Sequence, residues 1–374
     1  MSEIPKILIL ENSYDVTGAF KSIFGLTQSI RHEFKFYFAI RKKTRLPFFL
    51  VKKKIPFIEL PFLEISKHWK AFFYLPMLFL NTFRIFRYIN QQKIQIIHIN
   101  DLYNMIGVLI KIVNPKIKVI YHVRLMPDSY AGKLYPFWLK LINRWADQII
   151  VVSEAVYQSI STIVSKPIQI IYDFVPLEEK WNGHHEETKP IKFVYPANYT
   201  KGKGQNFALK AFAEAFRTCQ DILLTFYGSD AGVKKNEQFK NELIRESDAL
   251  GIKDFVLFEG PTDNIEKIIK EADVVLMFSE SESFSLVCYE TMYYGRPIIA
   301  SDCGGPRELV EDLTSGILVP NKDIISMTKA ISLMASNSDL RDKISKKAYL
   351  RVRDKVLRHD ASGRLSRTYK RQIA

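Results

Sequence analysis

The chain has 374 residues, more than one ordinary hydrophobic core accommodates, so its length predicts two domains. Hydrophobic residues make up 47% and charged residues 25%, which is the composition of a soluble globular protein. The net charge of +14 favours an anionic membrane surface or a phosphate-rich ligand as partner, while the lack of zinc-finger, RNP and helix-turn-helix patterns argues against nucleic acid.

Cysteine content and the first residues suggest a compartment. Cys219, Cys288 and Cys303 do not lie at metal-ligand spacing, and so few cysteines favour a reducing, cytoplasmic setting. The opening residues, MSEIPKILIL, have no charged leader before a long apolar run, so we expect no signal peptide.

Short apolar runs rich in β-branched and aromatic residues alternate with helical patterns along the whole chain. Segments such as 205–218 and 236–250 are long enough for crossover helices, and this alternation predicts parallel sheets covered by helices on both faces. The two blocks of runs predict two Rossmann-like domains. The predicted strands are 6–10, 34–40, 94–99, 118–123 and 148–153, then 192–197, 222–228, 254–260, 273–279 and 297–301.

A polar, turn-rich segment without periodicity, 177–190, is the predicted linker. We therefore place a first Rossmann-like domain at 1–176 and a second at 191–350. The basic segment 339–374 is predicted to be helical, and 351–374 is assigned as a closing helix.

Several common nucleotide motifs are absent. The loop after the first predicted strand contains only Gly18 instead of G-x-G-x-x-G, which disfavours a nicotinamide dehydrogenase. The P-loop motif is also missing, which disfavours a P-loop kinase. Neither H-x-x-x-D nor D-x-D follows a predicted strand near a second acidic cluster, so the sequence does not call for a metal.

Basic and aromatic residues gather in the first half, at 41–43, 52–54 and 68–89. The apolar part of 68–89 is too short to span a bilayer. It fits either an interfacial helix or a helix buried on the first sheet. In the interfacial interpretation, head groups meet Lys67, Lys70, Arg84 and Arg87, and Trp69, Phe72, Phe73 and Phe79 lie below them.

The segment 279–308 carries the most specific pattern, with Glu282 and Glu290 eight residues apart between two predicted strands. We predict a helix from Phe284 to Tyr294, with Ser283 as its N-cap and Gly295 after its end. Free backbone N–H groups at the start of this helix would form an anion site.

The residues that follow are in the order found in one family. They are Gly295, Pro297, the strand 298–301, Gly304-Gly305 and Glu308. Together with Glu282 and Glu290, they resemble the E-x7-E donor site of glycosyltransferase family 4. The resemblance implies a GT-B fold, in which two Rossmann-like domains face each other across a cleft and the C-terminal helix crosses back to the first domain.

The same resemblance implies an activity. A sugar would pass, with retention, from a nucleotide-diphosphate sugar bound by the second domain to a glycan or lipid-linked acceptor on the first, in cell-surface polysaccharide synthesis. No metal cofactor is implied. Two alternatives stay open: a GT-B sugar-nucleotide epimerase, and a catalytically silent binding partner.

Site residues of the second domain follow from the motif matches. Lys203-Gly204 and Ala211-Phe212 match the family's phosphate-binding segment, where Lys203 would stabilise the leaving diphosphate and Asn198 replaces the family's arginine. Glu290 would bind the ribose and Glu282 the sugar hydroxyls. The diphosphate would meet the backbone amides of Phe284, Ser285 and Leu286, and the nucleotide would lie near Gly228 and Thr262.

The first domain matches more loosely. His122 follows an apolar run and resembles the family histidine that faces the donor sugar, and Arg124 is a candidate for an acceptor phosphate. His98 and Asn100 end another predicted strand. Gly18 would let the first loop approach a phosphate closely.

Overall fold

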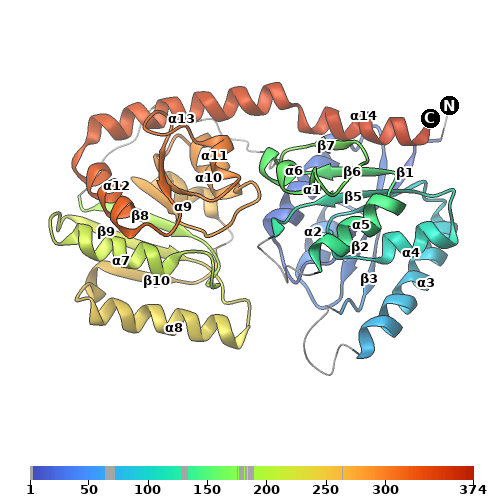
Figure 1. Cartoon of the computed structure of the whole chain (residues 1–374), viewed down its shortest axis with the longest axis horizontal. Coiled ribbons are helices and arrows are strands. Elements are labelled where there is room, and N and C mark those ends of the chain that lie inside the picture. The colour runs from blue at the N-terminus through green and yellow to red at the C-terminus, as the bar shows by residue number, and fades with distance from the viewer. Residues whose placement is uncertain are drawn as a thin grey trace. The chain divides into compact units, whose positions relative to one another are not determined.

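The computed structural model describes residues 3–63, 72–127, 134–174, 176, 181, 183, 189–262 and 264–374 (Figure 1). The chain forms two compact units, one comprising Met1–Pro176 with His359–Ala374 and the other Leu177–Arg358. The first division follows Pro176, where the sequence analysis ended its first domain. Most of the expected linker lies outside the described residues, and the second division comes at Arg358 instead of 350.

The first unit is built on a parallel sheet of seven strands in the order β3-β2-β1-β4-β5-β6-β7. Chain order reverses between β1 and β4, which leaves a crevice at the carboxyl ends of these two strands. The strands are β1 (Lys6–Glu11), β2 (Lys35–Arg41), β3 (Phe57–Leu60), β4 (Ile96–Ile99), β5 (Lys118–Val123), β6 (Gln148–Val151) and β7 (Ile168–Ile170).

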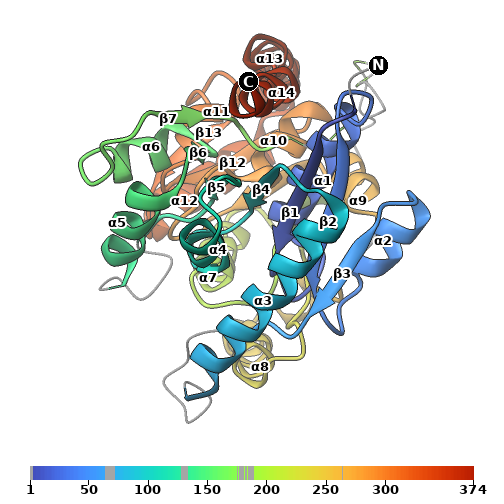
Figure 2. The same ribbon diagram turned by 90° about the vertical axis from the view of Figure 1, so that its right-hand side faces the viewer.

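Helices cover both faces of this sheet (Figure 2). The first-unit helices are α1 (Gly18–Ser29), α2 (Leu46–Lys52), α3 (Tyr74–Gln92), α4 (Ile106–Val113), α5 (Tyr135–Trp145), α6 (Glu154–Ile160) and α14 (Ala361–Ile373). One core lies between the sheet and α1, α2 and α14, where Phe20, Leu50 and Tyr369 are buried. The closing helix α14 therefore packs on the first unit, as the resemblance implied.

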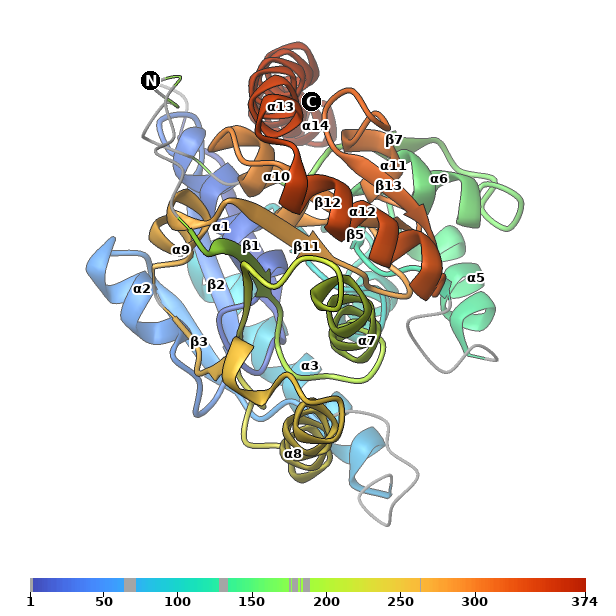
Figure 3. The ribbon, with the colours of Figure 1, turned by 90° about the vertical axis from the view of Figure 1, so that its left-hand side faces the viewer.

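The second unit repeats the plan with six parallel strands in the order β10-β9-β8-β11-β12-β13. Figure 3 labels β11, β12 and β13 of this sheet. Chain order reverses here between β8 and β11. The strands are β8 (Ile191–Pro196), β9 (Ile222–Tyr227), β10 (Val256–Glu259), β11 (Val274–Met277), β12 (Ile298–Asp302) and β13 (Ile317–Pro320). The prediction of two α/β units with parallel sheets is confirmed.

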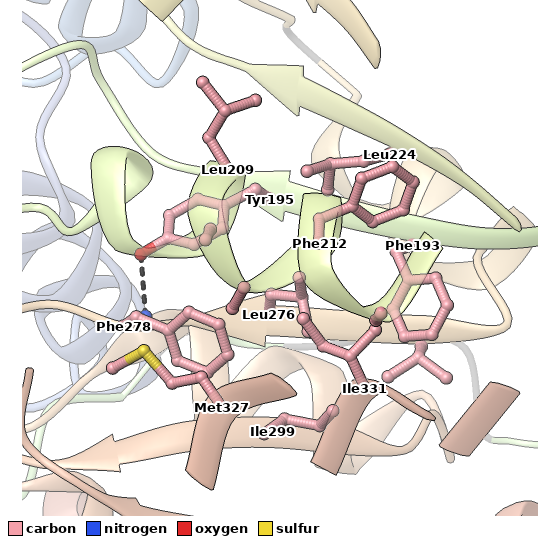
Figure 4. Packing of buried hydrophobic residues seen from close by; sticks show 14 of the residues in the cluster. Phe193, Tyr195, Leu209, Phe212, Leu224, Leu276, Phe278, Ile299, Met327 and Ile331 are labelled. Carbon is pink, nitrogen blue, oxygen red and sulfur yellow. Dashed lines mark hydrogen bonds between the residues drawn. The ribbon is translucent and has the colours of Figure 1, made fainter. Parts of the chain in front are cut away.

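The second-unit helices are α7 (Gln205–Phe216), α8 (Lys234–Ala249), α9 (Ile265–Glu271), α10 (Leu286–Tyr293), α11 (Pro306–Leu309), α12 (Ile324–Ser336) and α13 (Ser338–His359), with a 3-10 turn at Lys253–Phe255. The core between the sheet and helices α7 and α12 contains Phe193, Phe212, Leu276 and Ile331 (Figure 4). The helix expected over 339–374 is interrupted at Asp360, which adopts a φ of 47° and caps α14 by accepting from the Gly363 amide at 3.1 Å.

Candidate functional site

The loops after β8 and β11 meet at the point where strand order reverses in the second unit. Loops at such a point form the ligand crevice of open parallel sheets. Lys203 follows β8 and Glu282 follows β11, and their side chains meet, with Lys203 Nζ 2.7 Å from Glu282 Oε1. Two residues that the sequence analysis selected separately, 79 positions apart, are therefore direct partners.

Glu282 is held in place from two sides. Ser279 Oγ donates to the same Oε1 atom at 2.8 Å, so this oxygen accepts from a cation and a hydroxyl. The charge of Glu282 raises the pKa of Lys203, and the amine remains protonated in the neutral range. The Lys203 side chain is 41% exposed and that of Glu282 17%, so an incoming ligand can reach the lysine.

The backbone around Lys203 is fixed by close packing. Gly204 has a φ of 78°, and a Cβ built there would lie 1.9 Å from the carbonyl oxygen of Phe278, so no other residue fits. The buried Tyr195 hydroxyl accepts from the Phe278 amide at 2.7 Å (Figure 4). The same hydroxyl donates to the Lys203 carbonyl at 2.5 Å. This single hydroxyl joins the two loops that carry Lys203 and Glu282.

The glycine pair at 304–305 explains the position of the Glu282 backbone. Glu282 pairs with Gly304 as in a parallel strand, donating to the Cys303 carbonyl at 3.1 Å and accepting from the Gly305 amide at 2.8 Å. A Cβ on Gly305 would lie 2.4 Å from Phe284 Cα. The motif's glycines thus allow the Glu282 loop to lie directly against the turn after β12.

The start of the E-x7-E helix differs from the prediction. Helix α10 begins at Leu286 and its N-cap is Ser285, whose hydroxyl accepts from the Cys288 amide at 3.3 Å, so the predicted N-cap at Ser283 is wrong. Ser285 reaches this position through a positive φ of 77°. Phe284 precedes the cap and is buried, and the expected set of open amides shifts from Phe284, Ser285 and Leu286 toward the first turn of α10.

Glu290 lies in the second turn of α10 and its exposed fraction is 7%. A carboxylate buried on a helix has little rotational freedom, because protein interiors are closely packed. This rigidity suits a carboxylate that receives two hydroxyl donors, the task that the sequence analysis gave to Glu290.

Three further predicted residues organise the neighbouring loops. Asn198 Oδ1 accepts from the Ser229 amide at 3.0 Å, tying the loop after β8 to the loop after β9. A Cβ on Gly228 would lie 2.1 Å from the Ala197 carbonyl oxygen, so this position needs glycine for packing. Thr262 Oγ1 accepts from the Asn264 amide at 3.0 Å and so closes a turn before α9.

The first unit holds its own polar network at the carboxyl ends of β1, β4 and β5. Asn100 donates to Glu11, and Arg124 Nε donates to Asn100 Oδ1 at 2.7 Å. The Arg124 guanidinium also pairs with Asp173 and donates to His122 Nδ1 at 3.4 Å. Each of the three guanidinium nitrogens of Arg124 thus has a protein partner. Gly18 is the exposed first residue of α1.

His122 belongs to a buried chain of hydrogen bonds that ends on α14. His122 Nδ1 lies 3.2 Å from His98 Nε2, and His98 Nδ1 lies 2.7 Å from the Tyr369 hydroxyl. Because the guanidinium of Arg124 only donates, His122 Nδ1 must accept. His98 Nε2 then donates, Tyr369 donates to His98 Nδ1, and the proton of neutral His122 lies on Nε2.

Both histidines are neutral because they are buried. Desolvation lowers the pKa of His98 to about 3, with the charge of Arg124 acting in the same direction. Burial also lowers the pKa of His122 well below its ordinary value, again helped by Arg124. A neutral imidazole with a fixed Nε2 proton is a hydrogen-bond donor of defined direction.

The sequence analysis missed Tyr195, Asp173 and Tyr369 as partners of site residues. Tyr195 lies near the carboxyl end of β8, which was predicted, so its position was an available signal. Asp173 follows β7, a strand that was not predicted, so that signal was missing for it. Tyr369 lies 271 residues from His98, and no local pattern links the two. Among the described residues, no cluster of three or more His, Cys, Asp or Glu is arranged to bind a metal ion. Within the same residues, no helix has both the length and the apolarity needed for a bilayer span.

Two family models match adjoining parts of the chain. The model described as "Glycosyl transferases group 1" matches residues 178–351, and "Glycosyltransferase Family 4" matches residues 56–179. The first match falls on the unit that carries Lys203, Glu282 and Glu290.

Curated relatives are similar over part of their length. A D-inositol 3-phosphate glycosyltransferase of Corynebacterium jeikeium is 31% identical over 158 residues, which is 41% of this chain and 37% of that protein. The lipopolysaccharide 1,6-galactosyltransferase of Salmonella typhimurium is 27% identical over 181 residues, or 46% of this chain and 48% of that protein. The chain thus spans less than half the length of these two relatives.

Solved structures are similar over nearly the whole chain. Anabaena HepE in complex with UDP and glucose has a TM-score of 0.80 at 18% identity, covering 97% of this chain and 99% of that one. Sucrose-phosphate synthase of Thermosynechococcus elongatus also has a TM-score of 0.80, at 17% identity and 99% coverage of both chains. With the family models, these similarities establish that the chain belongs to glycosyltransferase family 4 and has the two-domain GT-B fold.

Proposed function

We propose that the chain is a retaining glycosyltransferase that moves a sugar from a nucleotide-diphosphate sugar to a glycan acceptor in cell-surface polysaccharide synthesis. The observation that carries this proposal is the Lys203–Glu282 pair, held at the reversal point of the second sheet in front of α10. A protonated amine and the open amides of a helix start are suited to a diphosphate, and a carboxylate is suited to sugar hydroxyls.

The pair also suggests how binding and transfer are linked. A diphosphate that reaches Lys203 competes for its ammonium, which releases Glu282 Oε1 to accept from a sugar hydroxyl. As the bond to the anomeric carbon breaks, negative charge grows on the diphosphate and its interaction with Lys203 strengthens. Glu290, buried and rigid on α10, receives the ribose hydroxyls.

The retaining outcome and the donor class rest on family membership. In the proposed mechanism, the acceptor oxygen attacks from the face that the diphosphate leaves, and a phosphate oxygen takes its proton. The HepE structure, determined with UDP and glucose, makes UDP-sugars the first donors to try.

The deciding experiment measures nucleotide release. The chain is first screened against UDP-, GDP- and ADP-sugars by thermal shift, where a donor at a hundred times its dissociation constant adds about 2.7 kcal/mol of stability. Nucleotide release that depends on an added acceptor supports transfer. Rearrangement of the donor without release would indicate the epimerase alternative. Donor binding without either reaction would indicate a silent partner.

We also propose that the first unit docks on an anionic membrane, which would bring the transferase to a lipid-linked acceptor. Helix α3 buries Thr82, Ile85 and Ile89 on its inner side, and its outer side exposes several large apolar residues. Phe79 and Phe83 on that face are 60% and 59% exposed. Helix α3 therefore carries apolar residues on both its inner and its outer side.

Basic residues accompany the exposed apolar residues. Arg84 and Arg87 are exposed near the outer face of α3, and α2 presents Phe48, which is 68% exposed, just before Lys52, Lys53 and Lys54. Cations beside exposed aromatic side chains match an anionic interface. Of the residues first assigned to this surface, Lys67, Trp69 and Lys70 lie outside the described residues.

A further inference from the structure

The loop after β11, which carries Glu282, is held along its backbone by side chains from β12 and from the turn after β13. The buried Ser301 of β12 donates through Oγ to the Ser279 carbonyl at 2.6 Å. Asn321, in the turn after β13, donates through Nδ2 to the next carbonyl, that of Glu280, at 2.7 Å. Because β12 lies between β11 and β13, this second bond joins the loops of two strands that are not neighbours in the sheet.

Glu280 also connects this turn to the loop that carries Lys203. Its amide donates to the carbonyl of Gly202, one residue before Lys203, at 2.8 Å. Its carboxylate pairs with Nζ of Lys322, in the turn after β13, at 2.5 Å. Glu280 is therefore bonded on one side to the loop after β8 and on the other side to the turn after β13. Glu282, the partner of Lys203, is only two residues further along.

The backbone of Lys322 has a conformation that suits glycine better than lysine. Its φ is 65°, in the left-handed region, where a residue with a side chain is strained. The turn lies between Pro320, the last residue of β13, and Asp323, the N-cap of α12, and glycine would adopt this conformation without strain. Strain of this kind persists where the side chain has a role. The contact that lysine provides here and glycine cannot is the ion pair with Glu280.

These contacts lie at the surface, so they are suited to fixing a position more than to stabilising the fold. The side chains of Lys322 and Glu280 are 53% and 36% exposed, and exposed ion pairs add little to the free energy of unfolding. A misplacement of about 1 Å in a catalytic site, in contrast, can cost roughly a hundredfold in rate. A shift of that size in this loop would break the 2.7 Å contact of Lys203 with Glu282.

We propose that Asn321 and Lys322 are positioning residues of the donor site. They hold the loop 279–282 and, through it, fix the distance between Lys203 and Glu282. The assignment of this site to a sugar donor rests on the proposed transferase function. The competing role for the turn is support for the start of α12, which would affect stability only.

Lys322→Gly and Glu280→Gln break the same ion pair with opposite changes in net charge. Amide exchange in 279–283, followed by mass spectrometry without ligand, should rise roughly two- to fivefold in both variants. Lys322→Arg keeps the cation and should keep the wild-type rate. Lys43→Gly is the matched control, because Lys43 is an exposed lysine of the first unit with a φ of 62°, and the rate in 279–283 should not change. Wild-type exchange in both pair variants overturns the proposal.

Unfolding in urea separates positioning from support of the fold. Lys322→Gly removes the ion pair but also relieves the positive φ, so its free energy of unfolding should stay close to the wild-type value. A role confined to the start of α12 would instead lower the stability and leave the donor site unchanged. Lower stability with unchanged affinity for a sugar nucleotide therefore overturns the proposal.

Affinity is measured by calorimetry with UDP-glucose, GDP-mannose and ADP-glucose. The sugar nucleotide that binds wild type should bind Asn321→Ala roughly three- to tenfold more weakly, because one hydrogen bond to the loop is lost. Both ion-pair variants should also bind it more weakly. Asn241→Ala, at an exposed position of α8, is the control and should keep wild-type affinity. Opposite changes of affinity in Lys322→Gly and Glu280→Gln would show that only charge matters, and would overturn the proposal.

The exchange measurement needs no donor, so it separates this proposal from the proposed function. Faster exchange in the variants, together with a wild-type chain that binds none of the three sugar nucleotides, would remove the transferase role and keep the link between the turn and the loop. Acceptor-dependent release of nucleotide by wild type, together with wild-type exchange in the variants, would do the reverse.

Discussion

The protonated amine of Lys203 is accessible to solvent and is also paired with the carboxylate of Glu282. Lys203→Ala should lower turnover more than donor affinity, because the charge matters most as the diphosphate leaves. Loss of one charged hydrogen bond costs about 1.5–3 kcal/mol, or roughly ten- to two-hundredfold in kcat. Steady-state kinetics with separate kcat and KM values measure the effect.

The matched control is Lys201→Ala. Lys201 lies two residues away, its side chain is 75% exposed and it pairs with Glu242 at 3.7 Å, so its loss should change little. Equal losses in both variants would show that general charge near the loop matters, and that the Lys203–Glu282 pair has no special role.

Glu290→Gln should keep the fold and weaken nucleotide binding. The substitution is isosteric, and it removes the negative charge of a carboxylate that is 7% exposed and assigned to the ribose. Titration with the donor nucleotide, followed by calorimetry, measures the change. Glu237→Gln on exposed α8 is the control. Wild-type nucleotide affinity in Glu290→Gln would exclude the ribose role.

The two buried histidines should make stability depend on pH. Their folded pKa values are depressed, so in the acidic range the unfolded chain binds protons that the folded chain does not. Their contribution is complete above the unfolded value of about 6.5 and is lost as pH falls toward the folded value of His98, about 3. The loss approaches about 1.4 kcal/mol per pH unit for each histidine.

Urea unfolding between pH 7 and 5 tests this prediction in wild type and in His98→Gln. The variant should lose less stability over that interval than wild type. His32→Gln removes an exposed histidine, whose side chain is 73% exposed, and should follow the wild-type curve. A wild-type slope in His98→Gln would mean that His98 does not remain neutral in the fold.

Helix α3 exposes large apolar residues that packing within the first unit does not require. Binding of the chain to anionic vesicles should weaken as salt rises without disappearing, because cations are screened and inserted aromatic side chains are not. Replacing Lys52, Lys53 and Lys54 by Glu should reduce binding further, at about 1 kcal/mol per cation removed. Vesicle co-sedimentation across a salt series measures both effects.

The control replaces three exposed lysines of the second unit, Lys234, Lys235 and Lys253, by Glu. It makes the same change in net charge and should bind vesicles nearly as well as wild type. A chain that ignores anionic vesicles even at low salt would leave a water-soluble acceptor as the better assignment.

Three strands were not predicted from the sequence, and all three were missed for the same physical reason. Strands β3, β7 and β13 all lie at sheet edges, and each has only three or four residues. An edge strand is buried less completely than a central one, so it lacks the long apolar run by which the central strands were found. All the predicted strands are present, because buried parallel strands leave an unmistakable pattern.

The start of α10 shows where local sequence reasoning ends. Ser283 and Ser285 are both good N-cap residues, and local sequence does not choose between them. The choice depends on the positive φ of Ser285 and on the contact of Gly305 with Phe284, which is distant in sequence. Similarly, motif matching selected Lys203 and Glu282 individually but gave no indication that they pair.

At the scale of the whole molecule, each unit places its ligand features at the reversal point of its own sheet. A donor nucleotide should therefore slow amide hydrogen exchange in 197–204 and 279–288, the loops and helix start around Lys203 and Glu282. The interior strands of both sheets should change little. Exchange measured by mass spectrometry with and without the nucleotide tests this, and protection that spares both segments would contradict the donor site.

The return of α14 to the first unit has a consequence for synthesis on the ribosome. Residues 1–176 emerge first, yet their core lacks Leu365 and Tyr369, and His98 lacks its hydroxyl donor, until the last helix has been translated. The second unit, continuous from Leu177 to Arg358, has all its residues earlier. The unit whose synthesis begins first is therefore completed last. Until α14 has been made, the incomplete core of this unit is the part of the chain that most needs protection by chaperones.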